Sequence, residues 1–188
     1  MKIFKEIIGW IGTVIIAILI ALFLNLFVFQ PREVFGSSME PTLHSGNIGI
    51  ISKISHDFSI VPSYNDIVVI DSRVNHIHNI GDDLMDSLKY NIVSSMIFKQ
   101  TDRTYWIKRV IGRPRDKIEI KDNKVYRNGK LLIEKYIKEK MYNNTDLKVT
   151  VPARHIFVMG DNRNNSEDSR VIGCVPIENV IGKLKFKF

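Results

Sequence analysis

The sequence predicts a mainly β fold, in which one globular domain follows an N-terminal transmembrane helix. Residues 7–29 form an apolar run without a charged side chain, which favours the helix. The rest of the chain consists mostly of short β-branched and aromatic segments separated by turn residues, which favours strands. A length of 188 residues with 45% apolar side chains suits one domain plus an extra hydrophobic element.

The apolar run over 7–29 is long enough to cross a bilayer. As a helix it would reach about 35 Å, against a hydrocarbon core of about 30 Å. A cleaved secretory signal is the alternative, because Lys2 and Lys5 could form its basic start, but the run is too long and no small-residue cleavage site follows it. We therefore expect a single-pass cell-membrane protein with a cytoplasmic tail over 1–6, a transmembrane helix over 7–29 and an extracytoplasmic domain over 30–188.

The net charge of +7 suits attraction to an anionic membrane surface, so the lipid bilayer is an expected partner. Nucleic acid is not expected, because the basic residues are scattered and no nucleic-acid-binding motif occurs. With one cysteine, Cys174, the chain forms no internal disulfide.

Strand patterns recur along the domain. Three short β-branched or aromatic runs are predicted strands: 66–70, 105–111 and 155–159. Residues 116–132 alternate apolar and polar side chains around two turn-forming pairs, Asp122-Asn123 and Asn128-Gly129. This segment is a predicted meander of short antiparallel strands.

Two further segments have distinct patterns. The C-terminal KLKFKF, residues 183–188, also alternates, and we expect it at a sheet edge, where its lysines discourage aggregation. Residues 82–98 carry apolar side chains at three- and four-residue spacing behind an acidic start, which predicts an inserted amphipathic helix. A packed helix is favoured over a membrane-surface helix, because the polar face is not rich in lysine.

The stretch FGSSMEPTL, residues 35–43, contains two adjacent serines. Ser38 can be a nucleophile only if a base takes its proton, because a free serine hydroxyl reacts weakly near neutral pH. None of the five histidines lies in a recognisable catalytic motif: His44, His56, His76, His78 and His155. Each fits better as a structural or surface residue.

Lysine is an alternative base, and Lys108 lies inside the strand-like run YWIKRVIG. A strand there places Trp106, Lys108 and Val110 on one face. Burial among apolar groups lowers the pKa of a lysine from about 10.4, as a base near neutral pH requires. Taken alone, Lys108 fits better as an edge-strand lysine whose ammonium reaches solvent. A pairing with Ser38 is what favours catalysis.

A third stretch, MGDNRNNSEDSR at 159–170, follows a predicted strand and is dense in Gly, Asn, Asp and Ser. Such a loop can position other groups, and the alternative is an ordinary polar loop with side-chain turns. Its interpretation depends on the other two stretches.

Together, GSSMEPTL, YNDIVVI, YWIKRVIGRPRDKIEI and GDNRNNSEDSR, in this order behind an apolar run, resemble the sequence boxes of bacterial type I signal peptidases. The resemblance implies a catalytic domain of two antiparallel β-sheets, acting as a serine endopeptidase without a metal or organic cofactor. It implies Ser38 as nucleophile and Lys108 as general base. It also implies that Ser166 orients Lys108, and that Asp168 and Arg170 are structural residues of the loop.

The resemblance further implies that the backbone N–H of Ser38 contributes to an oxyanion hole. Gly36 occupies the place where some members carry a serine that supplies a second donor, so that donor is unassigned. Arg115 stands where the family more often has glycine. Met39 and Phe35 are expected to line an apolar rim of the substrate site.

The implied function is removal of N-terminal signal peptides from secretory preproteins with Ala-x-Ala-like cleavage sites, on the outer face of the cell membrane. Two alternatives belong to other classes. One is a self-cleaving repressor with the same dyad, which requires a DNA-binding module. The other is a catalytically inactive relative that binds signal sequences or scaffolds export machinery. The oligomeric state is not predicted.

Overall fold

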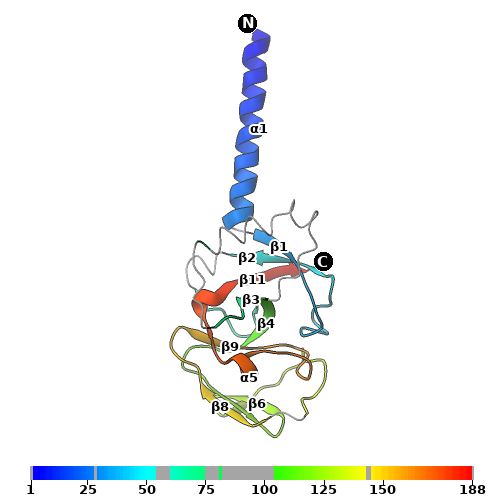
Figure 1. The fold of residues 1–188 in the computed structure, drawn as a ribbon, viewed down its shortest axis with the longest axis vertical. Coiled ribbons are helices and arrows are strands. Elements are labelled where there is room, and N and C mark those ends of the chain that lie inside the picture. The colour runs from blue at the N-terminus through cyan, green and yellow to red at the C-terminus, as the bar shows by residue number, and fades with distance from the viewer. Residues whose placement is uncertain are drawn as a thin grey trace.

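The structure is a computed structural model that describes residues 2–27, 29–53, 60–74, 81, 104–142 and 145–187. The helix predicted over 82–98 lies outside these residues. Within them, a long helix leads into two antiparallel sheets, and the domain is mainly β as predicted (Figure 1).

Helix α1 (Lys2–Phe27) extends away from the β domain (Figure 1). Large apolar side chains project from it and are more than half exposed at Trp10, Ile16 and Leu19. None of the helices in the described part of the chain combines the length and the apolar character that crossing a bilayer requires. The transmembrane helix over 7–29 and the domain limits beside it stay predictions.

The larger sheet has seven strands in the order β1-β2-β11-β3-β4-β9-β10, and its neighbouring strands run antiparallel. These strands are β1 (Phe29–Glu33), β2 (Ile48–Ser52), β3 (Ile67–Asp71), β4 (Tyr105–Gly112), β9 (His155–Met159), β10 (Val175–Pro176) and β11 (Val180–Lys187). Two short helices flank its C-terminal strands: α5 (Ser169–Ile172) and η1 (Ile177–Asn179). The strands predicted at 66–70, 105–111 and 155–159 are therefore confirmed as β3, β4 and β9.

The smaller sheet has four antiparallel strands in the order β7-β6-β5-β8 and forms the end of the domain opposite α1 (Figure 1). Its strands are β5 (Lys117–Lys121), β6 (Lys124–Arg127), β7 (Lys130–Leu131) and β8 (Leu147–Thr150). Both predicted turns connect them, with positive φ at Asp122, Asn123, Asn128 and Gly129. Consecutive positive φ values give the type I′ geometry that matches strand twist, so the predicted meander is confirmed.

The C-terminal strand β11 lies inside the larger sheet, between β2 and β3. The prediction of an edge strand is wrong for β11 as a whole, which has a neighbouring strand on each side, although residues 184–187 pair with β2 alone. Alternating lysines are compatible with any strand that has one polar face. Lys183, for example, forms an ion pair with Asp66, with 2.6 Å between Nζ and Oδ1. The start of the strand, Val180 to Lys183, pairs with β3, and the part from Lys183 to Lys187 pairs with β2.

Strands β4 and β9 are shared by two hydrophobic clusters, because successive side chains of a strand point to opposite faces. Val110 and Val158 belong to the cluster within the larger sheet. Ile111 and Phe157 belong to the cluster that packs against the smaller sheet. Each of these side chains is at most 1% exposed, and burial of such a side chain contributes about 1.5–3 kcal/mol. This double packing fixes β4, the strand that carries Lys108.

Candidate active site

The serine-containing segment is anchored to the larger sheet by its own apolar side chains. Met39 and Leu43 are 1% and 0% exposed, and with Val34 they form a small cluster against Ile107 of β4. The prediction that Met39 lines an open apolar rim is therefore wrong, because packing against the sheet takes up this side chain. Phe35 remains 46% exposed and stays available to a partner or substrate.

Ser38 and Lys108 are in contact. The Lys108 Nζ atom lies 2.9 Å from Ser38 Oγ, a hydrogen-bond distance. Strand β4 holds the lysine by its backbone, paired to Val68 of β3, and only 4% of its surface is exposed. Its Nζ also lies 5.4 Å from the centre of the Trp106 ring. Among the described residues, Ser38 Oγ is the hydrogen-bond partner of this amine.

Burial lowers the pKa of Lys108 from its ordinary value of 10.5 to about 8. Desolvation is the largest cause, since an ammonium loses its hydration in a low-dielectric environment. The charges of Asp168 and Glu167 oppose the change, and the charge of Arg170 adds to it. An appreciable fraction of this amine is therefore neutral at mildly alkaline pH, which an ordinary lysine does not achieve.

Two asparagines of the loop that follows β9 form hydrogen bonds with the serine segment, and we call this set of hydrogen bonds the asparagine clasp. The backbone N–H of Asn162 donates to the carbonyl oxygen of Ser38 at 3.0 Å, and its side-chain amide donates to the carbonyl oxygen of Ser37 at 3.1 Å. The Asn165 amide donates to Ser37 Oγ at 2.8 Å. Ser37 is thus engaged in the clasp, while the Ser38 hydroxyl faces the lysine.

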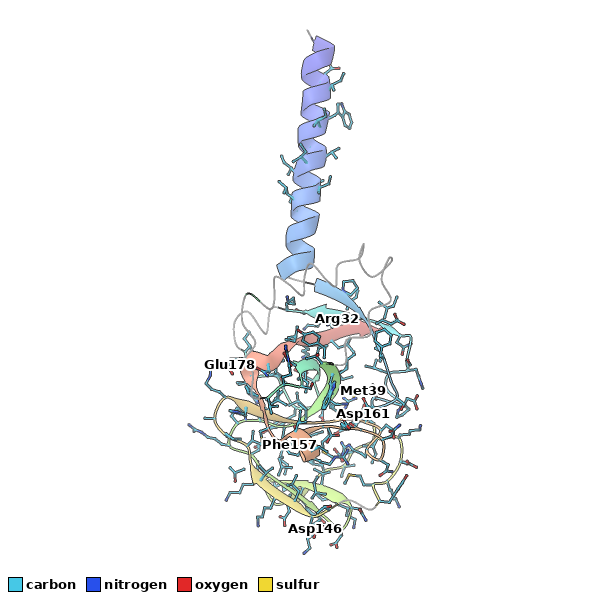
Figure 2. The ribbon with its side chains drawn as sticks, viewed as in Figure 1. Arg32, Met39, Asp146, Phe157, Asp161 and Glu178 are labelled. Carbon is cyan, nitrogen blue, oxygen red and sulfur yellow. The ribbon has the colours of Figure 1, made fainter. Side chains whose placement is uncertain are left out.

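A buried ion pair forms a second connection between this loop and β4. Arg109, next to Lys108 on the strand, donates to both carboxylate oxygens of Asp161 at 2.7 and 2.6 Å. Asp161 is fully buried and also accepts a hydrogen bond from Thr42 of the serine segment. Met39 and Asp161 accordingly lie in the same part of the domain (Figure 2). Three separate chain segments are joined around the site.

The roles of Asn162, Asn165, Arg109 and Asp161 are not predicted from the sequence. The signals were present, since the asparagines belong to MGDNRNNSEDSR and the arginine follows the proposed base directly. Only the fold shows which segments these side chains reach, because the contacts span loops far apart in the chain.

Asp168 organises the far end of the same loop. Its carboxylate accepts hydrogen bonds from Gly160 N at 3.0 Å, from Ser166 Oγ at 2.9 Å and from Arg170 Nε at 2.8 Å. Asp168 is also the N-cap of α5, where a carboxylate satisfies free backbone N–H groups. These hydrogen bonds join Asp168 to Arg170 and to two other residues of the loop, and the structural role of Asp168 and Arg170 stays a prediction.

Ser166 lies next to Gly160, which separates it from the serine segment. A Cβ atom built on Gly160 would lie 2.3 Å from Ser166 Oγ and 2.5 Å from the Ser38 carbonyl oxygen. The Ser166 hydroxyl donates to Asp168, and the described residues include no hydrogen bond between Ser166 and Lys108. The orienting role of Ser166 stays a prediction.

The backbone N–H of Ser38 donates to no acceptor within the part of the chain that the structure describes. It is therefore free to donate to a ligand. Gly36, two residues earlier, has a φ of 80°, a conformation that glycine adopts without steric cost.

The described histidines are not partners of Ser38. His44 Nδ1 lies 3.8 Å from Glu40 Oε1, and His155 Nδ1 lies 2.8 Å from the Ala153 carbonyl oxygen. His56, His76 and His78 lie outside the described residues. Among the residues that are described, no group of three or more His, Cys, Asp or Glu side chains could hold a metal ion.

A serine hydroxyl that is hydrogen-bonded to a buried lysine amine, in a β-rich domain, is the arrangement of the serine–lysine hydrolases. Comparison with known proteins gives the particular family. The sequence model described as "Signal peptidase, peptidase S26" matches residues 7–188, and the chain belongs to this family. It is a signal peptidase enzyme.

Two relatives at the level of sequence agree with this family. The chain is 36% identical over 178 residues to a probable signal peptidase I-1 of Synechocystis sp., covering 95% of this chain and 80% of the relative. It is 32% identical over 189 residues to signal peptidase I T of Bacillus subtilis, covering 95% and 83%. A crystal structure of a signal peptidase I from Enterococcus faecalis aligns with a TM-score of 0.46 at 27% identity, over 66% of this chain and 97% of that one.

Proposed function

We propose that this signal peptidase removes N-terminal signal peptides from secretory preproteins with Ser38 as its nucleophile and neutral Lys108 as its general base. The observation that supports the proposal most directly is the 2.9 Å separation between Lys108 Nζ and Ser38 Oγ. A base must lie within hydrogen-bond reach of the proton it removes. The lowered pKa of Lys108, about 8, supplies the neutral amine.

The reaction proceeds in two stages. Lys108 takes the Ser38 hydroxyl proton as Oγ attacks the scissile carbonyl carbon, and the resulting ammonium gives that proton to the leaving amide nitrogen when the C–N bond breaks. The signal peptide is then held as a serine ester. Lys108 next takes a proton from water, hydroxide attacks the ester carbonyl, and the ammonium returns the proton to Ser38 Oγ.

The negative charge on the carbonyl oxygen needs hydrogen-bond donors while it develops. We assign one donor to the backbone N–H of Ser38, which has no acceptor among the described residues. Such a donor typically contributes about 2.7–4 kcal/mol to the transition state. Gly36 carries no side chain that could serve as a second donor, so that donor must come from another group.

Around this dyad we propose supporting roles for three residues. Ser166 orients the Lys108 amine once the site is engaged with substrate, and Asp168 with Arg170 holds the loop that carries Ser166. The hydrogen bonds that converge on the Asp168 carboxylate support the second role. We also propose Ala-x-Ala-like cleavage sites, on the strength of the family resemblance, with the substrate bound as an added strand.

We further propose that the uncharged run over 7–29 anchors the enzyme in the cell membrane, with residues 1–6 inside and the β domain outside. Support comes from the absence of charge in this run and from the exposed apolar side chains of α1. Extraction of cell membranes with alkaline carbonate tests the anchor. A chain that appears in the carbonate supernatant would contradict it.

The dyad is tested by incubating the full chain in detergent micelles with a preprotein and identifying the products by mass spectrometry. Ser38→Ala and Lys108→Ala should each lower the rate by at least about 1,000-fold. Lys130→Ala, at an exposed position of β7, serves as the matched control and should leave the rate unchanged. Cleavage by either dyad variant at the wild-type rate would disprove the assignment.

The same incubation addresses the two alternatives. A self-cleaving repressor would shorten its own chain without added preprotein, and an inactive relative would bind the preprotein without releasing a product. A single new cut at the signal-peptide junction, with the enzyme chain intact, is the result expected here.

A further inference from the structure

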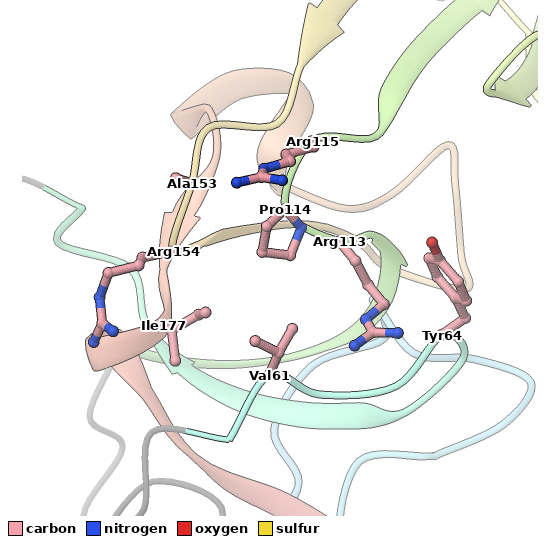
Figure 3. A pocket seen from close by; sticks show the side chains of 8 residues that line it. All are labelled: Val61, Tyr64, Arg113, Pro114, Arg115, Ala153, Arg154 and Ile177. Atoms are coloured by element: carbon pink, nitrogen blue, oxygen red, sulfur yellow. The ribbon is translucent and has the colours of Figure 1, made fainter.

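A pocket with a cavity volume of about 470 Å³ lies apart from the serine and the lysine. Figure 3 shows that its walls come from the loop after β4, the turn before β9, the start of η1 and the segment before β3. It is lined by Val61, Tyr64, Arg113, Pro114, Arg115, Ala153, Arg154 and Ile177. We propose that this pocket binds a small organic anion, with a carboxylate or phosphate group on an apolar body.

The charge of the pocket is the first argument. Three arginines line it and no acidic residue does. Arg154 is ion-paired with Glu178. Among the described residues, the Nε atom of Arg113 is buried without a hydrogen-bond acceptor, and Arg115 is exposed at the pocket. A guanidinium group of this kind matches the planar oxygen pair of a carboxylate or phosphate.

Arg113 is held in place without being neutralised. Its Cζ atom lies 5.3 Å from the centre of the Tyr64 ring, and its Nε atom is buried without a hydrogen-bond partner. Asp116 is close in sequence, but its carboxylate accepts hydrogen bonds from the Tyr64 hydroxyl, the Asn128 amide and the Arg113 backbone N–H. A buried donor without a partner is uncommon in proteins, and an oxygen of a ligand in this pocket would satisfy it.

Arg115 gives a second, independent indication. Its φ is 73°, a left-handed conformation in which a side chain costs energy and glycine does not. Its backbone N–H donates to the Val151 carbonyl oxygen, so the loop is fixed in this form. From this backbone conformation Arg115 lines the pocket (Figure 3).

The volume of the pocket and its apolar side chains indicate the part of the ligand that carries no charge. Val61, Pro114 and Ile177 present an apolar surface between the arginines (Figure 3). A volume of about 470 Å³ is in the range of small-molecule sites, about 300–1,000 Å³, and exceeds what inorganic phosphate alone would fill. An apolar body on this floor removes hydrocarbon surface from water, which favours binding by about 25 cal/mol per Å².

Binding is tested with the full chain in non-ionic detergent micelles, by calorimetry and by ligand-observed NMR. The probes are phenyl phosphate, inorganic phosphate and benzyl alcohol, with empty micelles as the blank. We expect phenyl phosphate to bind saturably at one site, inorganic phosphate to bind at least about tenfold more weakly, and benzyl alcohol to show no saturation. Absence of saturable phenyl phosphate binding would overturn the proposal, as would equal affinity for inorganic phosphate.

Variants locate the site. Arg113→Gln and Arg115→Gly should each weaken phenyl phosphate binding by about tenfold or more, because each removes charge-assisted hydrogen bonds. Lys130→Gln removes the same charge from an exposed position on β7 and should leave the affinity unchanged. Arg115→Gly also relieves the positive φ, so the thermal midpoint should not fall, and weaker binding by this variant cannot be attributed to unfolding. Unchanged affinity in both arginine variants would overturn the proposal.

Discussion

Lys108 Nζ lies 2.9 Å from Ser38 Oγ, although seventy positions separate the two residues in the chain. The pairing depends on two packing features. Strand β4 is buried in the middle of the larger sheet and presents the lysine. Met39 and Leu43 pack the serine segment against the same sheet. The contact therefore links the chemistry of the site to the stability of the fold, and both can be measured.

The rate of preprotein cleavage should rise with pH through the pKa of Lys108. The base must be neutral, and its pKa is about 8, so below that pH kcat/KM should fall about tenfold per pH unit. Above it the rate should level off. Steady-state kinetics between pH 6 and 9.5 provide the measurement, and a flat profile would show that Lys108 is not the base.

Replacing Lys108 by methionine should stabilise the folded protein while abolishing activity. The pKa falls from 10.5 to about 8 on folding, so at about 1.4 kcal/mol per pH unit the buried ammonium costs about 3 kcal/mol at pH 7. The folded wild type binds fewer protons between these two pH values, so its stability rises with pH across that window. The advantage of Lys108→Met should be complete below pH 8 and vanish above about pH 10.5.

Denaturant unfolding at pH 7 and pH 10 measures this difference. Lys130→Met, at an exposed position of β7, is the control and should not change the pH dependence. A Lys108→Met protein that is less stable than the wild type at pH 7 would mean that the hydrogen bond to Ser38 outweighs the desolvation of the amine.

Local sequence patterns predict much of this protein, but only where neighbours in the chain decide the structure. The type I′ turns at Asn128-Gly129 and Asp122-Asn123 follow from residues that tolerate positive φ. The strand at YWIKRVIG follows from its β-branched and aromatic residues, but the burial of Lys108 does not, because both Lys108 and its neighbour Arg109 are buried. Likewise, the interior position of β11 does not follow from KLKFKF, because edge and interior strands of a half-exposed sheet share one pattern.

The remaining site residues depend on contacts between distant segments. From the sequence alone, Asn162 and Asn165 resemble ordinary turn residues. The structure shows that their side chains donate hydrogen bonds to Ser37. From the sequence, Met39 is a candidate for substrate contact. The structure excludes this contact because the Met39 side chain is buried. Such contacts are fixed by tertiary packing, which local propensity does not encode.

The asparagine clasp should matter for turnover more than for substrate binding. Asn162→Ala removes the side-chain hydrogen bond to the Ser37 carbonyl oxygen, and Asn165→Ala removes the one to Ser37 Oγ. Displacing a nucleophile by about 1 Å can cost up to about 100-fold in rate. We expect kcat to fall by about tenfold to 100-fold in Asn162→Ala, with KM nearly unchanged.

Asn164→Ala is the matched control for the clasp, because it lies in the same loop but donates to Glu139 and to the Lys140 carbonyl oxygen. Steady-state kinetics of the three variants, each with its thermal midpoint, provide the test. An equal loss of kcat in Asn164→Ala would show a general loosening of the loop and no positioning of Ser38.

The buried Arg109–Asp161 pair should be a strong stability determinant. Asp161→Ala leaves the arginine charge buried without its partner, which typically costs about 3–5 kcal/mol. Denaturant unfolding measures the loss. Glu40→Gln, which breaks an ion pair at the surface, is the comparison and should have little effect. A small loss in Asp161→Ala would mean that water or the Asn65 carbonyl oxygen, which already accepts from Arg109 at 2.9 Å, is enough for the buried guanidinium.

Gly160 should tolerate no side chain, and the consequence should appear in activity. A Cβ atom there would lie 2.5 Å from the Ser38 carbonyl oxygen and 2.3 Å from Ser166 Oγ, so Gly160→Ala must displace both segments. Gly182→Ala creates a comparable clash within the sheet, 2.6 Å from Ile51 Cγ2, but on β11, which β3 separates from the strand of Lys108. Both should lose about 1–3 kcal/mol of stability.

Only Gly160→Ala should lose turnover in the molecules that remain folded, by at least about 100-fold. The measurement is kcat for each variant at a temperature well below its thermal midpoint, normalised to the folded fraction. If Gly182→Ala lost kcat to the same extent, the effect would reflect general softening of the larger sheet. If Gly160→Ala retained kcat, the geometry of Ser38 would not depend on the close approach of the loop after β9.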